Sequence, residues 1–212
     1  MAAEKFVRSF NVCSFQEGDG KNKKLLGGKG ANLCEMTQIG LPVPPGFVIT
    51  TGACLTYLKQ KKEGLNQQLK NEIQASMALL EKETGKGLGN PENPLLVSVR
   101  SGAAMSMPGM MDTILNLGLN DETVAGLIRL TKNERFVYDL YRRLIQLFGS
   151  IAFDINDDDF NRIFNNIKKQ NEAEDDVHLD AKALKATCDG FLDLSRRRQA
   201  NPSHRTRMYS WN

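Results

Sequence analysis

The spacing of hydrophobic residues changes several times along the chain, from short apolar runs typical of strands to the three- and four-residue spacing typical of helices. Residues 6–12, 46–51 and 95–99 are short runs rich in apolar, aromatic or β-branched side chains, which predict strands. Polar stretches containing glycine or proline separate these runs from segments with helical spacing. Those segments predict helices at about residues 30–39, 51–62, 65–84, 121–130, 134–148, 157–167 and 181–194.

The order of these elements predicts an α/β (α+β) fold with two main parts and a tail. Residues 1–115 contain the predicted strands, and we expect them to form an α/β subdomain around a mixed sheet. Residues 116–194 are expected to form a helical subdomain. Residues 195–212 are polar and carry five arginines, so an RNA or phosphate patch is one interpretation, but we favour a disordered end.

Three glycines surround Lys29 at the point where the first predicted helix begins. Gly27, Gly28 and Gly30 have no side chains, so a ligand can approach this backbone closely. A helix N-terminus attracts anions through its free N–H groups and its dipole, and a lysine adds a full positive charge. The sequence therefore indicates an anion site at Lys29, although a simple turn into a helix explains one or two of the glycines equally well.

Arg100 directly follows the predicted strand at 95–99, at the carboxyl end where α/β sheets usually bind ligands. A guanidinium is always charged and can hold two phosphate oxygens at once. The alternative is an ion pair with a carboxylate, which for Arg100 alone we weigh slightly higher.

Small residues, a proline and four methionines at 101–111 predict a loop that covers a ligand. The methionines either contact a purine or, as we favour, fill gaps in the core.

The charges of the chain nearly balance, which limits the classes of partner. It has 212 residues, with 28 basic and 25 acidic side chains, a net charge of +3 and 41% hydrophobic residues. This composition indicates a globular protein and gives no general argument for a nucleic-acid or membrane partner. Any phosphate binding is therefore expected at a local site.

The cysteine, histidine and acidic residues do not indicate a metal site. The four cysteines lack CxxC spacing, which predicts reduced thiols, and with two histidines a zinc site is not indicated. The aspartates at 157–159 resemble metal ligands, but we favour a solvated helical turn because consecutive helical side chains diverge. No apolar leader or membrane-length run occurs, so we expect a cytoplasmic protein, with a plastid or glycosome left open.

Two common nucleotide-binding motifs are excluded around Lys29. A Walker loop requires Ser or Thr after the lysine, and Gly30 stands there. A dinucleotide-binding turn requires a third glycine at the position that Leu33 occupies. The phosphate site must therefore be of another kind.

Two long runs resemble the N-terminal nucleotide-binding region of the pyruvate, phosphate dikinase family. They are LLGGKGANLCEMTQIGLPVPPGFVITT at 25–51 and PLLVSVRSGAAMSMPGMMDTILNLGLND at 94–121. The resemblance extends with decreasing strength through YDLYRRLIQLFG to about residue 194. Phosphoenolpyruvate synthase is similar in GGKGANL and SVRS, but it usually lacks the continuation MMDTILNLG.

The resemblance implies an ATP-grasp nucleotide-binding domain in which Lys29 and Arg100 hold the phosphates of ATP. It also implies that residues 106–112, including Gly109 and Met111, form a loop that closes over the nucleotide. The complete family enzyme, a phosphotransferase, converts ATP, phosphate and pyruvate to AMP, diphosphate and phosphoenolpyruvate with magnesium, through a phosphohistidine on a swivelling domain. Such chemistry depends on positioning and charge neutralisation, which the two cations would supply.

By the same resemblance, we expect the second ATP-grasp lobe with its magnesium ligands, the phosphohistidine domain and the pyruvate-binding barrel beyond residue 212. Neither His178 nor His204 lies in a phosphohistidine motif, so no catalytic and no metal-binding residue is assigned. We therefore expect an ATP-binding part that does not complete the reaction alone, whether fragment, truncated gene model or shortened paralogue. The alternatives are the same part of another dikinase, such as phosphoenolpyruvate synthase, or a non-catalytic truncated paralogue. The full-length family is expected to be homodimeric.

Overall fold

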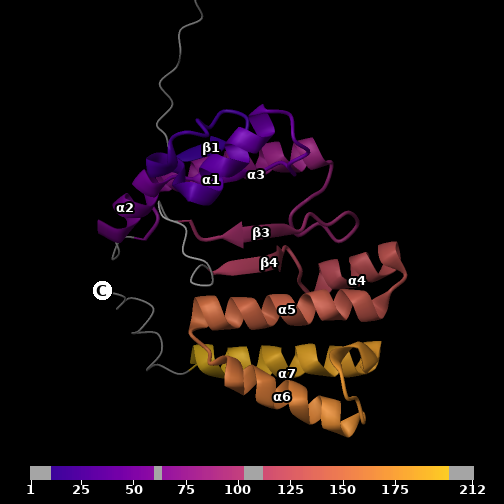
Figure 1. The fold of residues 1–212 in the computed structure, drawn as a ribbon. Helices are drawn as coiled ribbons and strands as arrows, with labels where there is room; N and C mark the ends of the chain where they lie inside the picture. Colours follow the sequence, from indigo (N-terminus) through magenta and orange to yellow (C-terminus); the bar gives the residue numbers. More distant parts are fainter. Residues whose placement is uncertain (1–10, 60–63, 103–111, 201–212) are drawn as a thin grey trace, which may run out of the picture. The chain divides into compact units, whose positions relative to one another are not determined.

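The computed structural model of the chain describes residues 11–59, 64–102 and 112–200, drawn as ribbons in Figure 1. They belong to two compact units, each assembled from two segments of the chain. The first unit comprises Met1–Gly85 and Ser101–Met111, and the second comprises Lys86–Arg100 and Asp112–Asn212. The boundary that the sequence predicted after residue 115 separates two subdomains of a nucleotide-binding fold, and this boundary stays a prediction. The packing units divide the chain differently.

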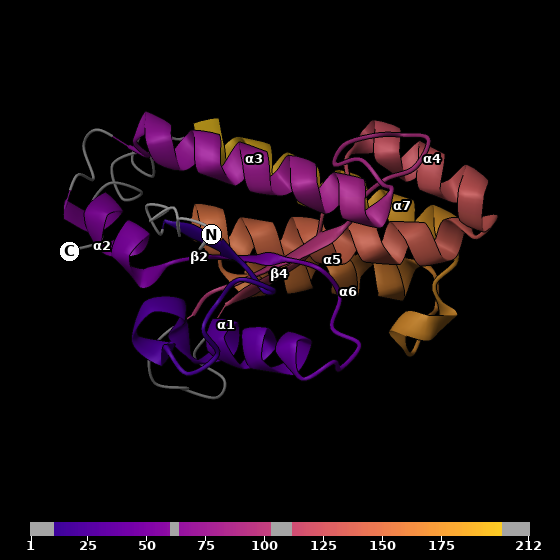
Figure 2. The ribbon, with the colours of Figure 1, turned by 90° about the horizontal axis from the view of Figure 1, so that it is seen from above.

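The first unit contains two short strands and three helices. β1 (Val12–Ser14) pairs antiparallel with β2 (Phe47–Ile49), and Figure 2 shows two of the helices on opposite sides of this pair. Those helices are α1 (Lys23–Gln38) and α3 (Gln67–Thr84), and α2 (Thr51–Lys59) directly follows β2. The small core consists of Cys13, Leu26, Ala31 and Cys34, with Val48 and other partly buried residues packed against it.

α1 begins before residue 30, where the apolar spacing predicted its start. The side-chain oxygen of Asn22 accepts a hydrogen bond from the N–H of Leu25, which caps an additional helical turn. Gly27 then interrupts the helix, and helical conformation resumes after it. The predicted glycine at the end of α1 is confirmed, since Gly40 has φ 84° and its N–H donates to the carbonyl of Thr37.

The second unit is mainly helical. α5 (Glu134–Phe153) lies between a pair of strands and the last helix of the unit, as Figure 1 shows. Phe160 and Phe191 are fully buried, and their rings meet edge to face with centroids 4.8 Å apart. The other helices are α4 (Asp121–Thr131), α6 (Asp157–Gln170), the short 3-10 helix η1 (Asp176–His178) and α7 (Ala181–Ala200).

The strands of the second unit are β3 (Val97–Arg100) and β4 (Thr113–Leu117), which pair antiparallel. The predicted α+β class is confirmed, but the prediction of one mixed sheet is wrong for the described residues. These residues form two separate two-stranded antiparallel sheets. The sequence pattern did not predict β4, whose apolar run is interrupted by Asn116. Antiparallel strands that are near in the sequence can pair without a crossover, so the hairpin forms within its own unit.

α7 continues beyond its predicted end at residue 194 as far as Ala200. Ser195 is buried, and its hydroxyl donates a hydrogen bond of 2.9 Å to the carbonyl of Phe191, so this turn is held within the helical core. The rest of the predicted tail, 201–212, and the predicted strand before residue 11 lie outside the described residues. Among the helices that the structure describes, none is both long and apolar enough to cross a membrane.

Candidate functional site

Lys29 lies in the first turn of the helical segment that resumes after Gly27. Gly27 has φ 69° and ψ 167°, a combination that is essentially restricted to glycine. The backbone turns there and the helix restarts, so Lys29 lies beside the N–H groups of a helix N-terminus. The structure therefore places Lys29 at a helix start, as the sequence predicted, although one more helical turn precedes the break.

Two of the three glycines beside Lys29 have roles in folding. Gly27 supplies the left-handed turn described above. A Cβ atom at Gly30 would lie 2.9 Å from Cγ2 of Val48, so the absence of a side chain allows α1 to pack closely against β2. Because folding explains both glycines, the case for a phosphate site depends more on Lys29 than on the glycines around it.

The Lys29 side chain reaches the segment that follows Arg100 in the sequence. Its Nζ donates a hydrogen bond of 3.5 Å to the carbonyl oxygen of Ser101, and both residues belong to the first unit. A carbonyl oxygen has no net charge, so this contact does not neutralise the ammonium group. Within residues 11–59, 64–102 and 112–200, Lys29 makes no ion pair. Its charge is thus available to an anion.

Arg100 is the exposed last residue of β3 and belongs to the second unit. It pairs with Thr113 across the ladder of the two strands. In the part of the chain that the structure describes, its guanidinium has no carboxylate partner, so the ion pair weighed as the alternative is not observed there. An exposed arginine with this geometry presents a planar set of donors to solvent.

Gly109 and Met111, the other two predicted site residues, lie outside the described residues, as does the rest of 103–111. Only Asp112 remains of the loop predicted at 106–112, and it is exposed. Lys29 belongs to the first compact unit and Arg100 to the second.

A cavity of about 400 Å³ in the second unit was not predicted from the sequence. It is lined by residues of three helices, and none of the predicted site residues is among them. Its polar groups largely bind one another. Tyr141 donates a hydrogen bond of 3.1 Å to Asp121, and Lys185 pairs with Asp189 at 3.1 Å. An ion pair between a lysine and an aspartate four residues apart on one helix can be predicted from the sequence, but a cavity formed by three helices cannot.

Two groups that line the cavity, a thiol and a phenol, stay protonated near neutral pH. Burial raises the pKa of the Cys188 thiol to about 12. Burial, together with the nearby Asp121, also raises the pKa of the Tyr141 phenol. Because both groups stay protonated, neither can act as an anionic nucleophile or base at physiological pH.

The three aspartates at the start of α6 behave as residues of a helix start. Asp159 pairs with Arg162 at 3.4 Å, and Asp157 accepts a hydrogen bond of 2.6 Å from Ser150. Over the described ranges, no group of three histidine, cysteine, aspartate or glutamate side chains is arranged to hold a metal ion. These contacts support the interpretation of residues 157–159 as a solvated turn.

Comparison with known proteins identifies similar sequences. Residues 23–84 match the family model described as pyruvate phosphate dikinase, AMP/ATP-binding domain. The chain is 55% identical over 181 residues to pyruvate, phosphate dikinase of Entamoeba histolytica and 46% identical over 180 residues to that of Clostridium symbiosum, each match covering 85% of this chain and 20% of the relative. It is 48% identical over 178 residues to the chloroplastic pyruvate, phosphate dikinase of Mesembryanthemum crystallinum, a match that covers 84% of this chain and 18% of the relative. The chain thus spans about a fifth of the length of these relatives.

Proposed function

Because this chain is homologous to the N-terminal ATP-binding region of pyruvate, phosphate dikinase, we propose that it binds the phosphates of ATP through Lys29 and Arg100. The matching domain family binds AMP or ATP, so homology supports a nucleotide as the ligand class. The matched residues 23–84 include Lys29. The two cations are the residues through which we expect the triphosphate to be held.

The position of Lys29 is the observation that carries this proposal. Its ammonium group stands at the start of a helix, where N–H groups and the helix dipole also attract negative charge. Its hydrogen bond to Ser101 uses a neutral carbonyl, which a phosphate oxygen can replace at little electrostatic cost. Lysine and helix start together form the kind of anion site that a triphosphate requires.

Arg100 adds the contact that a lysine cannot make. Its guanidinium can donate two parallel hydrogen bonds to one phosphate group, and it has no carboxylate partner in the described ranges. We assign Gly109 and Met111 to a loop that covers the bound nucleotide. That assignment rests on the resemblance of SMPGMMD to the corresponding family sequence.

The wider reaction belongs to the same proposal. We expect the protein to act in the conversion of ATP, phosphate and pyruvate to AMP, diphosphate and phosphoenolpyruvate through a phosphohistidine carried elsewhere. Magnesium would neutralise phosphate charge, but no set of metal ligands is arranged in the described parts, so no step is assigned to magnesium-binding residues here. On the family resemblance we also propose a second ATP-grasp lobe, phosphohistidine and pyruvate-binding regions as partners, a homodimer, and a cytoplasmic or organellar location.

Calorimetric titration of ATP with magnesium into the purified chain tests the phosphate site. Lys29→Ala and Arg100→Ala should each weaken binding by about tenfold or more, because each removes a charge-assisted contact worth about 1.4 kcal/mol or more. Lys82→Ala and Arg162→Ala are the matched controls. Lys82 is exposed on α3, and Arg162 pairs with Asp159 on the surface of α6. Both controls should bind ATP as the unaltered chain does.

The outcomes separate the proposal from its alternatives. Equal affinity of all five proteins would mean that the nucleotide binds elsewhere, and Lys29 and Arg100 would be structural cations. A folded chain without measurable ATP binding would refute the proposal that these residues suffice to hold a nucleotide. Titration of inorganic diphosphate in place of ATP shows whether the phosphates alone provide the contact.

A further inference from the structure

The charged side chains of α1 are reversed relative to the dipole of the helix. α1 begins with Lys23 and Lys24 and has no acidic side chain in its first turn, while its last turn contains Glu35 and no basic side chain. A helix is stabilised by acidic residues at its start and basic residues at its end. α4, α5 and α6 follow this rule, with aspartate or glutamate in the first turn of each. The lysines of α1 therefore lower the stability of the helix that carries them.

Lys23 and Lys24 are exposed, and their charges are not offset locally. Within the ranges that the structure describes, neither lysine forms an ion pair. Residues 20–34 carry four lysines, Lys29 among them, and no acidic residue. The start of α1 is thus a region of concentrated positive charge.

The start of α2 adds to this positive region. The hydroxyl of Thr51, the first residue of α2, donates a hydrogen bond of 2.7 Å to the carbonyl of Lys24. The first turn of α2 also lacks an acidic side chain. A helix start carries about half a positive charge, so the start of α2 has the same sign as the lysines beside it.

The positive charge lies close enough to Lys29 to act on a ligand that approaches it. Lys23 and Lys24 precede Lys29 by six and five residues, so their Cα atoms lie within roughly 22 Å of that of Lys29, however the chain bends. The screening length in water is about 30 Å at 0.01 M salt. An anion approaching Lys29 therefore meets the field of both lysines before any contact forms. Such a field raises the rate of association and depends strongly on salt.

We propose that Lys23 and Lys24 are steering residues that speed the association of polyphosphate nucleotides with Lys29. They act on the approaching anion through their field and need not touch the bound nucleotide. The inference rests on the proposed function, because it takes Lys29 as the contact to the phosphates. It explains the reversed charges of α1, since the residues that accelerate binding also weaken the start of the helix. Because the attraction grows with the charge of the ligand, ATP gains more than AMP does.

A double variant, Lys23→Gln with Lys24→Gln, removes the two charges from the full chain. Glutamine is a good helix former, and the carbonyl of residue 24 that Thr51 binds is unchanged. Lys70→Gln with Lys82→Gln is the matched control, because it removes two exposed charges from α3. As Figure 2 shows, α3 lies on the opposite side of the β1 and β2 pair from α1.

Stopped-flow mixing with a fluorescent ATP analogue and magnesium measures the rates of association and dissociation. At about 0.01 M salt the double variant should associate roughly fivefold more slowly than the unaltered chain, and at about 1 M salt the two should agree. Its dissociation rate should stay within about twofold, as should both rates of the control. Unchanged association at low salt, an equal loss at both salt concentrations or a change confined to dissociation would each overturn the inference.

Urea unfolding gives a readout that a merely structural role would move the other way. The double variant should unfold at a higher urea concentration than the unaltered chain, because the repulsion between the lysines and the start of the helix is removed. A lower midpoint would show that the lysines support the fold, contrary to the inference.

Lys29→Ala distinguishes failure of this inference from failure of the proposed function. If Lys29→Ala loses affinity for ATP while the double variant associates at the unaltered rate in low salt, only the steering inference fails. If Lys29→Ala binds ATP as the unaltered chain does, or if the unaltered chain does not bind ATP, the proposed function fails and the steering inference fails with it.

Discussion

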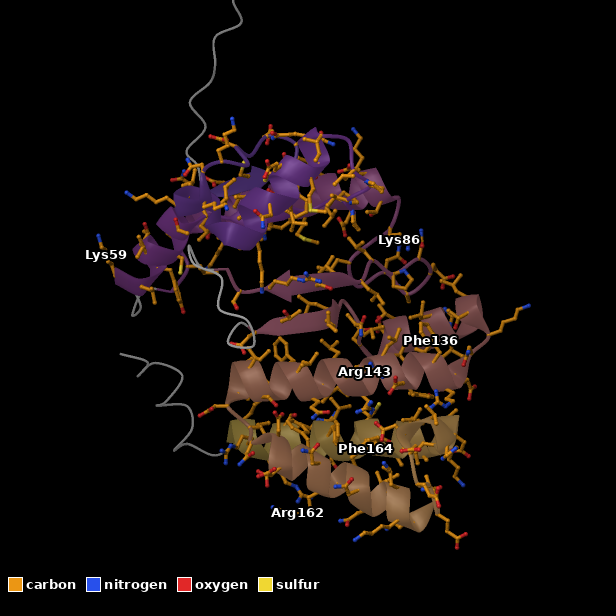
Figure 3. All side chains as sticks on the ribbon, in the orientation of Figure 1. Lys59, Lys86, Phe136, Arg143, Arg162 and Phe164 are labelled. Carbon is orange, nitrogen blue, oxygen red and sulfur yellow. The ribbon has the colours of Figure 1, made fainter. Side chains whose placement is uncertain are left out.

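Substituting Asp139 by alanine should destabilise the second unit by leaving a buried guanidinium without its counterion. Arg142 is 6% exposed, and it donates hydrogen bonds of 2.7 and 3.2 Å to Oδ1 of Asp139. The other oxygen of this carboxylate pairs with Arg143 at 2.9 Å. The Arg142 guanidinium also lies over the ring of Phe164, 4.5 Å from its centroid. Figure 3 labels Phe164 on α6 and Arg143 on α5, the two helices that this network joins.

The expected loss follows from the burial of the pair. Removing one partner of a buried ion pair costs about 3–5 kcal/mol, because the remaining charge stays desolvated and unpaired. The Asp139 side chain is 20% exposed, and the Phe164 ring would still contact the guanidinium, so we expect the lower end, about 3 kcal/mol.

Urea unfolding at pH 7, followed by circular dichroism, measures this loss. Asp159→Ala is the matched control, because Asp159 pairs with an Arg162 side chain that is 72% exposed. The exposed ion pair and the interaction of Asp159 with the start of α6 are both weak, so its cost should stay below about 1 kcal/mol. Combining Asp139→Ala with Arg142→Met should recover most of the stability, since no buried charge would remain. A loss below about 1 kcal/mol for Asp139→Ala, or equal losses for the two aspartates, would refute the reasoning.

The same pair makes the stability difference depend on pH in a defined direction. Burial by itself raises the pKa of Asp139, but the hydrogen bonds and charges of Arg142 and Arg143 outweigh it and bring the pKa below its ordinary value of 3.8. A lowered pKa in the folded state stabilises the protein above the unfolded-state pKa. The stabilisation is lost as the pH falls through the folded value. The gap between the unaltered protein and Asp139→Ala should therefore be complete at neutral pH and shrink below pH 3.8.

Two further predictions concern the first unit and the thiols. Gly27→Ala should lower the free energy of unfolding, measured with urea, by about 1–3 kcal/mol, because the φ and ψ of Gly27 suit only glycine. Gly52→Ala in α2 is the control and should not lower it, because the added Cβ would lie at an ordinary 3.6 Å from its nearest neighbour. Equal effects of the two substitutions would contradict this account. A thiol reagent at pH 8 should modify exposed Cys54 in the folded protein, while the other three cysteines, which are buried and have raised pKa values, react only after unfolding. Rapid modification of a second cysteine, measured by mass spectrometry, would show that burial does not protect them.

The helices were predictable because their signals are local. Apolar spacing located both ends of α3 and α4 closely and the start of α5, although α5 continues to Phe153, beyond its predicted end at residue 148. The glycine at the end of α1 was correctly identified from one residue and its neighbours. The position of Lys29 at a helix start was predictable for the same reason, since a lysine among glycines before a segment with helical spacing is a local signal in the sequence. Its role in binding ATP, and that of Arg100, stay predictions that the titrations test.

Other features of the protein were decided only by the tertiary structure, because they depend on contacts between segments that are far apart in the sequence. The separation into two antiparallel pairs, the shift of register between β3 and β4 and the continuation of α7 past residue 194 all arise from packing against neighbouring elements. Strand pairing and burial involve residues far apart in the chain, so no window of sequence contains the competing partners. The sequence by itself therefore determined the helices, the cations and the family resemblance, whereas packing decided the pairing of the strands and the burial that makes Arg142 and Asp139 interdependent.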